Sequence, residues 1–340
     1  MEDLWKKSLL DAGWSSRAIA QIPLCYAKST LASYNRVIVK YRCFCDSVHV
    51  DFPCTKSAVL TDFMCMLADS SDRPRSILRT AVSALSALFD CLQIDNPFVD
   101  KNLYKLQCAL VKSSTVDTMR KSKVMPIEPF FKLFESWGGN RTLCTEKLRL
   151  KSITLLALCM MLRPSDIAPK AVYFDKLTLT EQKLILCIDQ VVFEQDGKLT
   201  IKFLGIKNDT SRDGFDVTIP PASNPVVDPV LALKDYIFRT DTHRSSPKSP
   251  VFLQLCKPFG AISAATVSKI LSQAIKMAGL HGQGYTAKSF RPTGASMSVA
   301  AGVLPETVMQ IGRWKTKEVF FNHYVHKIVP QSFSDNLVNV

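Results

Sequence analysis

The 340-residue sequence contains no long hydrophobic run and no continuous apolar segment near its N-terminus. Its longest predominantly apolar stretch, from Ile153 to Leu162, has ten residues, whereas a membrane-spanning helix needs about 20. The first residues, MEDLWKKSLLDAGW, lack the apolar core of a secretory signal. We therefore expect an intracellular protein without a membrane span.

Glycine and proline are scarce, at 13 and 18 residues, and no internal repeat or low-complexity tract is visible. This composition excludes collagen-like and disordered proteins. Hydrophobic residues make up 47% of the chain, which at this length is enough to form a core in each of two domains.

The chain has 11 cysteines but no pair with the CxxC spacing typical of zinc ligands. Only Cys43 and Cys45 lie close together, and no second pair of ligands follows them. We therefore expect reduced, mostly buried thiols, with neither a disulfide framework nor a metal site.

Acidic residues are outnumbered, because 30 Asp and Glu stand against 43 Lys and Arg, for a net charge of +13. The excess is spread over the chain, with 17 basic and 12 acidic residues in positions 1–126 and 26 and 18 in positions 127–340. Such a balance is typical of proteins that bind polyanions, although it also favours solubility. Since both parts are basic, we expect both to contact one extended anion.

Apolar residues at helical spacing predict four helices in the first part of the chain, near residues 29–44, 57–68, 76–92 and 99–112. Four short amphipathic helices form a compact bundle. Arg73, Arg75 and Arg79 lie at the start of the third predicted helix, where arginine and a helix N-terminus both attract phosphate. A solvated, charged helix end is the alternative interpretation.

Residues 113–126 are polar and basic and end at a proline, which predicts a linker after a first domain at 1–112. Arg120, Lys121 and Lys123 lie in this segment. A linker that carries cations can itself follow a phosphate backbone.

The remaining residues, 127–340, predict a mostly helical α+β domain. Stretches rich in β-branched residues and separated by turn residues are typical of a small antiparallel sheet; they span 184–192, 199–204 and 215–219. Helices are expected near 128–137, 146–162, 229–239, 264–278, 289–301, 305–314 and 317–326.

Two clusters in this second part carry side chains suited to an anion. Arg163 has Asp166 three residues later, which fits either an oriented anion-binding arginine or a local ion pair. Ser289 is a fair helix N-cap, and Lys288 and Arg291 lie three residues apart beside it. Each cluster alone also has a purely structural interpretation.

A third cluster contains Trp314 and, ten residues later, Tyr324. A lone tyrosine on a helix is usually a core residue. However, the order Arg163, Lys288-x-x-Arg291, Trp314, Tyr324 resembles the signature of the tyrosine recombinases, or phage integrase family. The intervals of 23 residues from Arg291 to Trp314 and 33 from Arg291 to Tyr324 are of the size found in that family.

The resemblance covers nearly the whole chain. It implies a helical, SAM-like core-binding domain that clamps DNA at 1–112, a basic linker at 113–126 and a catalytic recombinase domain at 127–340. The expected fold class is therefore α+β and mostly α, with a small antiparallel sheet in the catalytic domain.

The resemblance also implies a role for each residue of the signature. Tyr324 would attack phosphorus and leave a 3′-phosphotyrosine and a free 5′-hydroxyl. Arg163 and Arg291 would hold one DNA phosphate and neutralise the charge of the transition state, with Asp166 bracing the site. Because protein cations supply the charge and the covalent bond keeps the phosphodiester energy, no metal, ATP or other cofactor is required.

In this family a lysine on a hairpin of the catalytic sheet protonates the departing 5′-oxygen. Lys207 lies where the predicted hairpin turn falls and is the favoured residue. Lys198 and Lys202 remain rivals, because the lengths of such hairpins vary.

Two positions depart from the commonest family pattern. Lys288 stands where histidine is usual; it is either a general base, which requires a lowered pKa, or only a phosphate contact. Trp314 replaces another frequent histidine, and its indole N–H can donate to a phosphate oxygen. His323 and His326 lie near Tyr324, and we interpret both as helix-face residues.

The segments Arg-Pro-Ser-Asp and Phe-Arg-Pro-Thr-Gly, together with the many cysteines, resemble recombinases of eukaryotic mobile elements, either tyrosine-recombinase retrotransposons or crypton-like elements. This implies double-stranded DNA as partner, a nuclear location in a eukaryote, and a tetramer on two duplexes in which the C-terminal tail docks on a neighbouring protomer. Two alternatives stay open: a DNA-binding protein of the same fold that has lost catalysis, and DNA relaxation like that of type IB topoisomerases.

Overall fold

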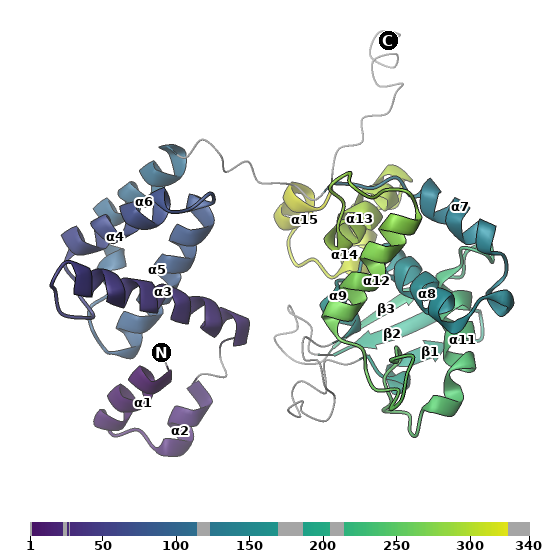
Figure 1. Ribbon diagram of the computed structural model, residues 1–340, viewed down its shortest axis with the longest axis horizontal. Helices are drawn as coiled ribbons and strands as arrows, with labels where there is room; N and C mark the ends of the chain where they lie inside the picture. Colours follow the sequence, from purple (N-terminus) through teal and green to yellow (C-terminus); the bar gives the residue numbers. More distant parts are fainter. Residues whose placement is uncertain are drawn as a thin grey trace, which may run out of the picture. The chain divides into compact units, whose positions relative to one another are not determined.

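The computed structural model describes residues 2–22, 26, 28–113, 123–168, 186–204 and 214–325. It divides into two compact units, Met1–Arg120 (unit 1) and Lys121–Val340 (unit 2), whose elements are labelled in Figure 1. Most of the linker predicted at 113–126 lies outside the described residues, and the limits of the predicted domains stay a prediction.

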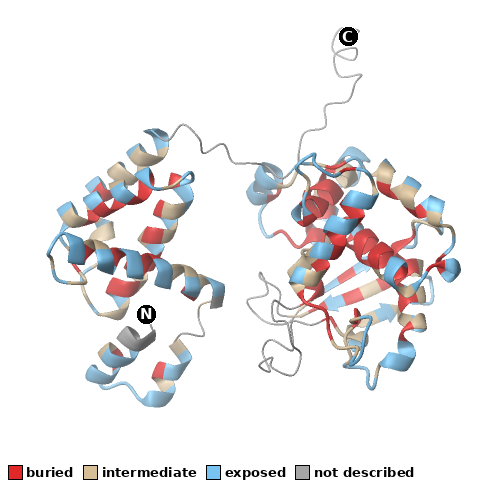
Figure 2. Ribbon diagram, in the orientation of Figure 1, coloured by how far each residue is buried: buried red, intermediate tan, exposed pale blue. Residues whose placement is uncertain are grey.

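Unit 1 is a bundle of helices with a main apolar core, around Tyr41, Phe63 and Phe89, and a smaller apolar cluster around Leu9, Ile19 and Leu31. The helices are α1 (Glu2–Asp11), α2 (Ser16–Gln21), α3 (Lys28–Ser47), α4 (Ser57–Asp69), α5 (Pro74–Cys91) and α6 (Lys101–Ser113). The four helices predicted between residues 29 and 112 are confirmed as α3 to α6. Tyr41, Phe63 and Phe89 have no exposed surface, and the inward faces of these helices are the buried ones in Figure 2.

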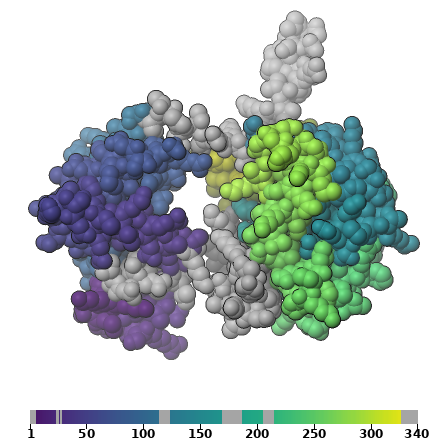
Figure 3. Space-filling model, viewed as in Figure 1, coloured from purple at the N-terminus to yellow at the C-terminus, as the bar shows by residue number. Residues whose placement is uncertain are grey.

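Unit 2 combines helices with one small sheet, which confirms the mostly helical α+β fold class. The helices are α7 (Glu128–Trp137), α8 (Thr145–Cys159), α9 (Pro164–Ile167), α11 (Pro229–Arg239), α12 (Ala264–Met277), α13 (Phe290–Ala300), α14 (Pro305–Gly312) and α15 (Lys317–His323). Ten of the 15 residues of α8 are buried, and this helix contacts α11, α12 and α13. Figure 3 shows teal segments from the beginning of the unit beside green segments from its later part. Across the described ranges, no helix is both long and apolar enough to cross a membrane.

The sheet contains three antiparallel strands in the order β1 (Val191–Phe193), β2 (Leu199–Phe203) and β3 (Phe215–Ile219). Along β2, the buried residues Leu199, Ile201 and Phe203 alternate with Thr200 and Lys202 on the other face. Phe203 pairs with Phe215, so both lie at the end of the sheet where the connection from β2 to β3 begins.

The first predicted strand, at 184–192, is wrong in its extent. The strand begins at Val191, because Ile188–Gln190 form a turn of 3-10 helix. The side chain of Gln190 accepts a hydrogen bond from the backbone N–H of Cys187 (2.8 Å), which stabilises this turn in place of a longer strand. Residues 184 and 185 lie outside the described residues.

All ten described cysteines are free thiols, but the prediction that they are mostly buried is wrong. Only Cys45 and Cys54 are buried, and four of the ten are exposed. Cys43 and Cys45 illustrate the reason, because residues two apart on a helix point to opposite sides, one to the core and one to solvent. The described residues hold no group of three or more His, Cys, Asp or Glu side chains that could bind a metal ion.

Helices α8 and α13 approach each other closely at Gly294. A Cβ atom at this position would overlap the carbonyl oxygen of Leu158 and lie 3.0 Å from the side chain of Met161. Arg291 lies on α13, and Arg163 follows α8 by a few residues. The missing side chain at Gly294 therefore sets the separation between the two segments that carry the predicted arginines.

We predict that Gly294→Ala lowers the free energy of unfolding of unit 2 by about 1–3 kcal/mol through overpacking. In an open helix the same change would instead stabilise by up to about 1 kcal/mol. Gly139→Ala is the matched control, because Gly139 has an ordinary φ of −69° and a Cβ there meets no atom within 4 Å. Urea unfolding of the full chain measures both variants, and equal stability of the two would contradict the close approach.

Candidate active site

Three of the predicted residues lie together in unit 2: Arg291, Trp314 and Tyr324. The Arg291 guanidinium carbon lies 4.1 Å from the ring centre of Trp314 and 5.2 Å from that of Tyr324. The centres of these two rings are 4.8 Å apart. Arg291 lies on α13, Trp314 follows the end of α14, and Tyr324 is the residue after α15. Helices α13 and α14 lie side by side in Figure 1.

Arg163 enters the site from the turn between α8 and α9. The helix predicted at 146–162 ends earlier, at Cys159, and Met161 has a left-handed φ of 51° that turns the chain. The Asp166 carboxylate accepts a hydrogen bond from the backbone N–H of Arg163 (2.9 Å) and lies 3.9 Å from its guanidinium. The Asp166 side chain is 3% exposed and that of Arg163 is 28% exposed, so Arg163 opens to solvent.

Arg291 is held by two backbone carbonyls. Its Nη2 donates to the carbonyl oxygen of Gly312 (2.5 Å), and its Nη1 donates to that of Met161. Among the described residues, the Nε of Arg291 and the indole Nε1 of Trp314 are buried and have no hydrogen-bond partner. Buried donors without an acceptor are costly, and two of them side by side suit an anion with several oxygens.

The electrostatics of the site are dominated by positive charge. Burial, together with the charges of Arg163 and Arg313, lowers the pKa of Arg291. The ordinary pKa of arginine is so high that the group still remains cationic at neutral pH. In the described part of the chain, Asp166 is the one carboxylate that forms ion pairs with these arginines.

Tyr324 lies at the C-cap of α15, one residue after the helix, whereas the prediction placed it within a helix at 317–326. Burial raises the pKa of the Tyr324 phenol, but the charges of Arg291 and Arg163, and side-chain hydrogen bonds to both, outweigh it. The net effect is a pKa below the ordinary value of a phenol. The charges of both guanidinium groups therefore act on the Tyr324 phenol.

The end of α14 positions Trp314. A Cβ atom on Gly312 would overlap the indole ring of Trp314, so only glycine allows the ring to fold back over the helix end. The ring packs against Phe320 of α15, with centres 5.0 Å apart. This packing fixes the indole between Arg291 and Tyr324.

Arg313 is a site residue that the sequence reasoning missed. It is 4% exposed and has left-handed backbone angles (φ 60°, ψ 47°). Its Nη2 lies 2.8 Å from Asp166 Oδ2, and its guanidinium carbon lies 4.6 Å from the ring centre of Phe203. The signal available in the sequence was a bulky residue directly after a glycine at a helix end.

The sheet carries two of the three candidate lysines, and the choice of Lys207 stays a prediction. Lys198 lies beyond the start of β2, at the opposite end of the strand from Phe203, and forms an exposed ion pair with Asp196 (2.5 Å). Lys202 lies on the face of β2 opposite to Phe203, whose ring contacts Arg313. Lys207 lies outside the described residues, in the connection that leaves β2 next to Phe203.

Lys288 is exposed, in a 3-10 turn (Ala287–Ser289) before α13, and its side chain forms no hydrogen bond or ion pair with another described residue. Ser289 is at the N-cap position as predicted, but its hydroxyl accepts from the N–H of Thr286 (3.2 Å) and does not cap α13. His323 is the exposed last residue of α15, and His326 lies outside the described residues.

The predicted DNA-binding residues are distributed over both units. Arg73, Arg75 and Arg79 are exposed at the start of α5, and none forms an ion pair with another described residue. In unit 2, Lys123 Nζ donates to the carbonyl oxygen of Gln283 (3.2 Å). Arg120 and Lys121 lie outside the described residues.

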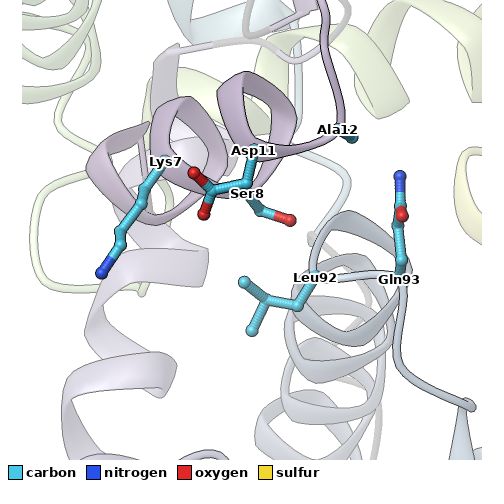
Figure 4. A pocket seen from close by; sticks show the side chains of 6 residues that line it. All are labelled: Lys7, Ser8, Asp11, Ala12, Leu92 and Gln93. Carbon is cyan, nitrogen blue, oxygen red and sulfur yellow. The ribbon is translucent and has the colours of Figure 1, made fainter.

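Two pockets lie among the described residues, and neither of these contains a predicted site residue. The larger, of about 450 Å³, lies in unit 1 between Lys7, Ser8 and Asp11 on α1 and Leu92 and Gln93 after α5 (Figure 4). The second, of about 380 Å³, lies between the beginning of α7 and the end of α12. The arginine–tyrosine cluster lies outside both of these pockets, and Arg163 is its most exposed arginine.

We predict that one tyrosine of the folded protein titrates below the ordinary pKa of about 10, and that this step disappears in Tyr324→Phe. Cations stabilise a phenolate, so Arg163→Gln shifts the step toward higher pH. An alkaline titration, followed by the absorbance of phenolate, measures the pKa of this step. The control is Tyr104→Phe, at an exposed position of unit 1. A step that survives in Tyr324→Phe would contradict the assignment.

No model of a known protein family matches the chain, and no curated protein matches it either. Solved structures share its fold. XerH site-specific recombinase bound to difH substrate has a TM-score of 0.56 and 14% identity, over 91% of this chain and 79% of that one. The Tn1549 transposon integrase with circular intermediate DNA has a TM-score of 0.54 and 13% identity, over 99% of this chain and 98% of that one. A lambda integrase dimer bound to a COC′ core site has a TM-score of 0.53 and 12% identity, over 94% of this chain and 75% of that one. The chain therefore has the fold of the tyrosine recombinases and integrases.

Proposed function

We propose that this protein is a site-specific DNA recombinase or integrase that cleaves and rejoins double-stranded DNA through a covalent 3′-phosphotyrosine intermediate. The observation that carries the proposal is the position of the Tyr324 ring, 5.2 Å from the Arg291 guanidinium carbon and 4.8 Å from the Trp314 ring centre, where the charges of Arg291 and Arg163 both act on the phenol. The fold, shared with recombinases and integrases solved on DNA, supports the same activity.

In the proposed cleavage step, the Tyr324 oxygen attacks the scissile phosphorus, and the bond from phosphorus to the 5′-oxygen breaks. The lowered pKa of Tyr324 eases loss of the phenol proton during attack. Arg163 and Arg291 donate to the nonbridging oxygens and stabilise the charge that develops on them. The unpartnered indole N–H of Trp314 lies beside Arg291 and donates to the same phosphate.

Two proton transfers complete the step. Lys207, in the connection between β2 and β3, is the proposed donor to the departing 5′-oxygen. The phenol proton passes either to the exposed Lys288, which must then be neutral, or to solvent, in which case Lys288 only contacts the DNA backbone. Attack of a 5′-hydroxyl from another strand on the phosphotyrosine then reverses the chemistry and rejoins the DNA, without ATP or a resident metal.

Unit 1 is proposed to clamp the duplex as a core-binding domain, with Arg73, Arg75 and Arg79 against phosphates and the segment 113–126 following the backbone. Four protomers on two duplexes are the proposed assembly. The Tn1549 comparison concerns a transposon integrase, which agrees with the proposal that the protein serves a mobile element. In a eukaryote, that work takes place in the nucleus.

We predict that the protein forms covalent adducts with nicked duplexes, in which the short 5′-hydroxyl strand diffuses away after cleavage. A library with a randomised sequence around the nick provides the substrate, and the adducts are detected on denaturing gels and sequenced. Tyr324→Phe abolishes the adduct, because phenylalanine has no nucleophile. Loss of either arginine lowers the rate by about 10²–10³-fold, more than loss of Asp166.

Tyr285→Phe is the matched control for this experiment, since Tyr285 is a half-buried tyrosine of unit 2 that packs on its core. Adducts that persist in Tyr324→Phe would refute the nucleophile. DNA binding without any adduct would favour the non-catalytic alternative. Relaxation of supercoiled plasmids with no preferred sequence would favour the topoisomerase alternative.

We also predict that joint replacement of Arg73, Arg75 and Arg79 by alanine weakens DNA binding and flattens its salt dependence. Each lost phosphate contact reduces the slope of log K against log salt by about 0.9, so three contacts reduce it by about 2.7. Fluorescence anisotropy between 50 and 200 mM salt, on the order of the physiological range, measures the slope. Joint replacement of Lys101, Lys105 and Lys112, exposed on α6, is the control, and an equal slope change there would argue against a specific contact at α5.

A further inference from the structure

We infer that Arg313 is a positioning residue that aligns the two arginines of the proposed phosphate site by binding Asp166. This inference rests on the proposed recombinase function. It concerns a residue outside the recombinase signature, whose place in the site emerges only from the folded chain.

The side chain of Arg313 connects to Arg163 through one carboxylate. Oδ2 of Asp166 lies 2.8 Å from Nη2 of Arg313, and the same oxygen accepts the backbone N–H of Arg163 (2.9 Å) and lies 3.9 Å from its Nη1. The side chains of Arg313 and Asp166 are 1% and 3% exposed. The side chain of Arg163 is partly exposed to solvent. Its position is therefore fixed mainly by the buried Asp166 carboxylate, which it shares with Arg313.

The backbone around Arg313 connects to Arg291. The residue before it, Gly312, accepts a hydrogen bond from Arg291 Nη2 (2.5 Å), and the residue after it, Trp314, places its ring 4.1 Å from the Arg291 guanidinium. Arg313 itself has left-handed backbone angles, which bulky residues rarely adopt. This conformation directs the side chain toward Asp166 while its neighbours stay on Arg291.

Arg313 also contacts the sheet. Its guanidinium lies 4.6 Å from the ring centre of Phe203, the last residue of β2 before the connection that carries Lys207. Arg313 therefore connects through its side chain to the segment of Arg163 and to the strand that leads to the proposed general acid, and through its two chain neighbours to Arg291. A short displacement of such a side chain is transmitted to all three.

A double-mutant cycle on single-turnover cleavage of the nicked duplex tests the inference. Arg313→Met, Asp166→Asn and the double variant are compared with wild type, with DNA affinity measured on the intact duplex. We expect each single variant to cleave about 10- to 100-fold more slowly, as for misplaced catalytic groups and less than after loss of Arg163 or Arg291, with DNA affinity changed less than about twofold. Because both act through one contact, the double variant is expected to be no slower than the single ones.

Arg313→Lys keeps the charge and is expected to restore at least part of the rate. Arg244→Met is the matched control, because Arg244 is a partly buried arginine of unit 2 whose hydrogen bonds to described residues all go to positions 237–251. It is expected to lower the melting temperature and leave the cleavage rate of the folded protein unchanged. The double variant, which removes both buried charges, keeps the test informative if Arg313→Met does not fold.

Wild-type cleavage by folded Arg313→Met would overturn the inference, as would single-variant effects that multiply in the double variant. A matching loss of rate in Arg244→Met would reduce Arg313 to a stabilising role and overturn it too. If wild type itself forms no adduct, the proposed function fails, and that outcome is distinct from all of these.

Discussion

The buried guanidinium of Arg291 joins segments of unit 2 that are far apart in the sequence. It donates to the carbonyl of Met161 after α8 and to that of Gly312 at the end of α14, and it lies against the rings of Trp314 and Tyr324. A buried cation is tolerated only when such hydrogen bonds replace water. Its Nε remains without a partner among the described residues. The same side chain thus stabilises the fold of the site.

Positive charge serves two purposes in this protein. Arg149, Arg239 and Arg244 in unit 2 donate to backbone carbonyls of neighbouring loops. Lys151 is fully buried, donates to the side chain of Asn140 (2.8 Å), and has its pKa lowered to about 8 by burial. These cations stabilise the interior of unit 2 and contribute little to its surface. The net charge of the sequence therefore overstates the charge available to an external anion in unit 2, whereas the arginines at the start of α5 in unit 1 are exposed.

Helices with a clear apolar periodicity were predictable from the sequence, as α3 to α6 and α11 to α13 demonstrate. Recognition of Arg163, Arg291, Trp314 and Tyr324 required a family pattern, because each residue alone looks structural. Arg313 could not be predicted in this way. Its partner Asp166 is 147 residues away, and its burial depends on a left-handed backbone conformation that follows from the packing of Trp314 over Gly312. Local sequence rules describe neither the distant partner nor this conformation.

The charge of the site matches the transition state of the proposed reaction better than its ground state. Arg163, Arg291 and Arg313 supply three positive charges, and Asp166 removes one by pairing, which leaves two. A phosphodiester in the ground state brings one negative charge. Tyr324 is a neutral phenol in the ground state, and loss of its proton during attack brings a second negative charge, so that full neutralisation occurs only when the pentavalent phosphorus is formed. Interactions that strengthen between ground state and transition state are the ones that accelerate a reaction. The pairing of Asp166 with Arg313 thereby acts on catalysis as well as on structure, since without that carboxylate the site would hold a surplus of charge that the reaction does not use.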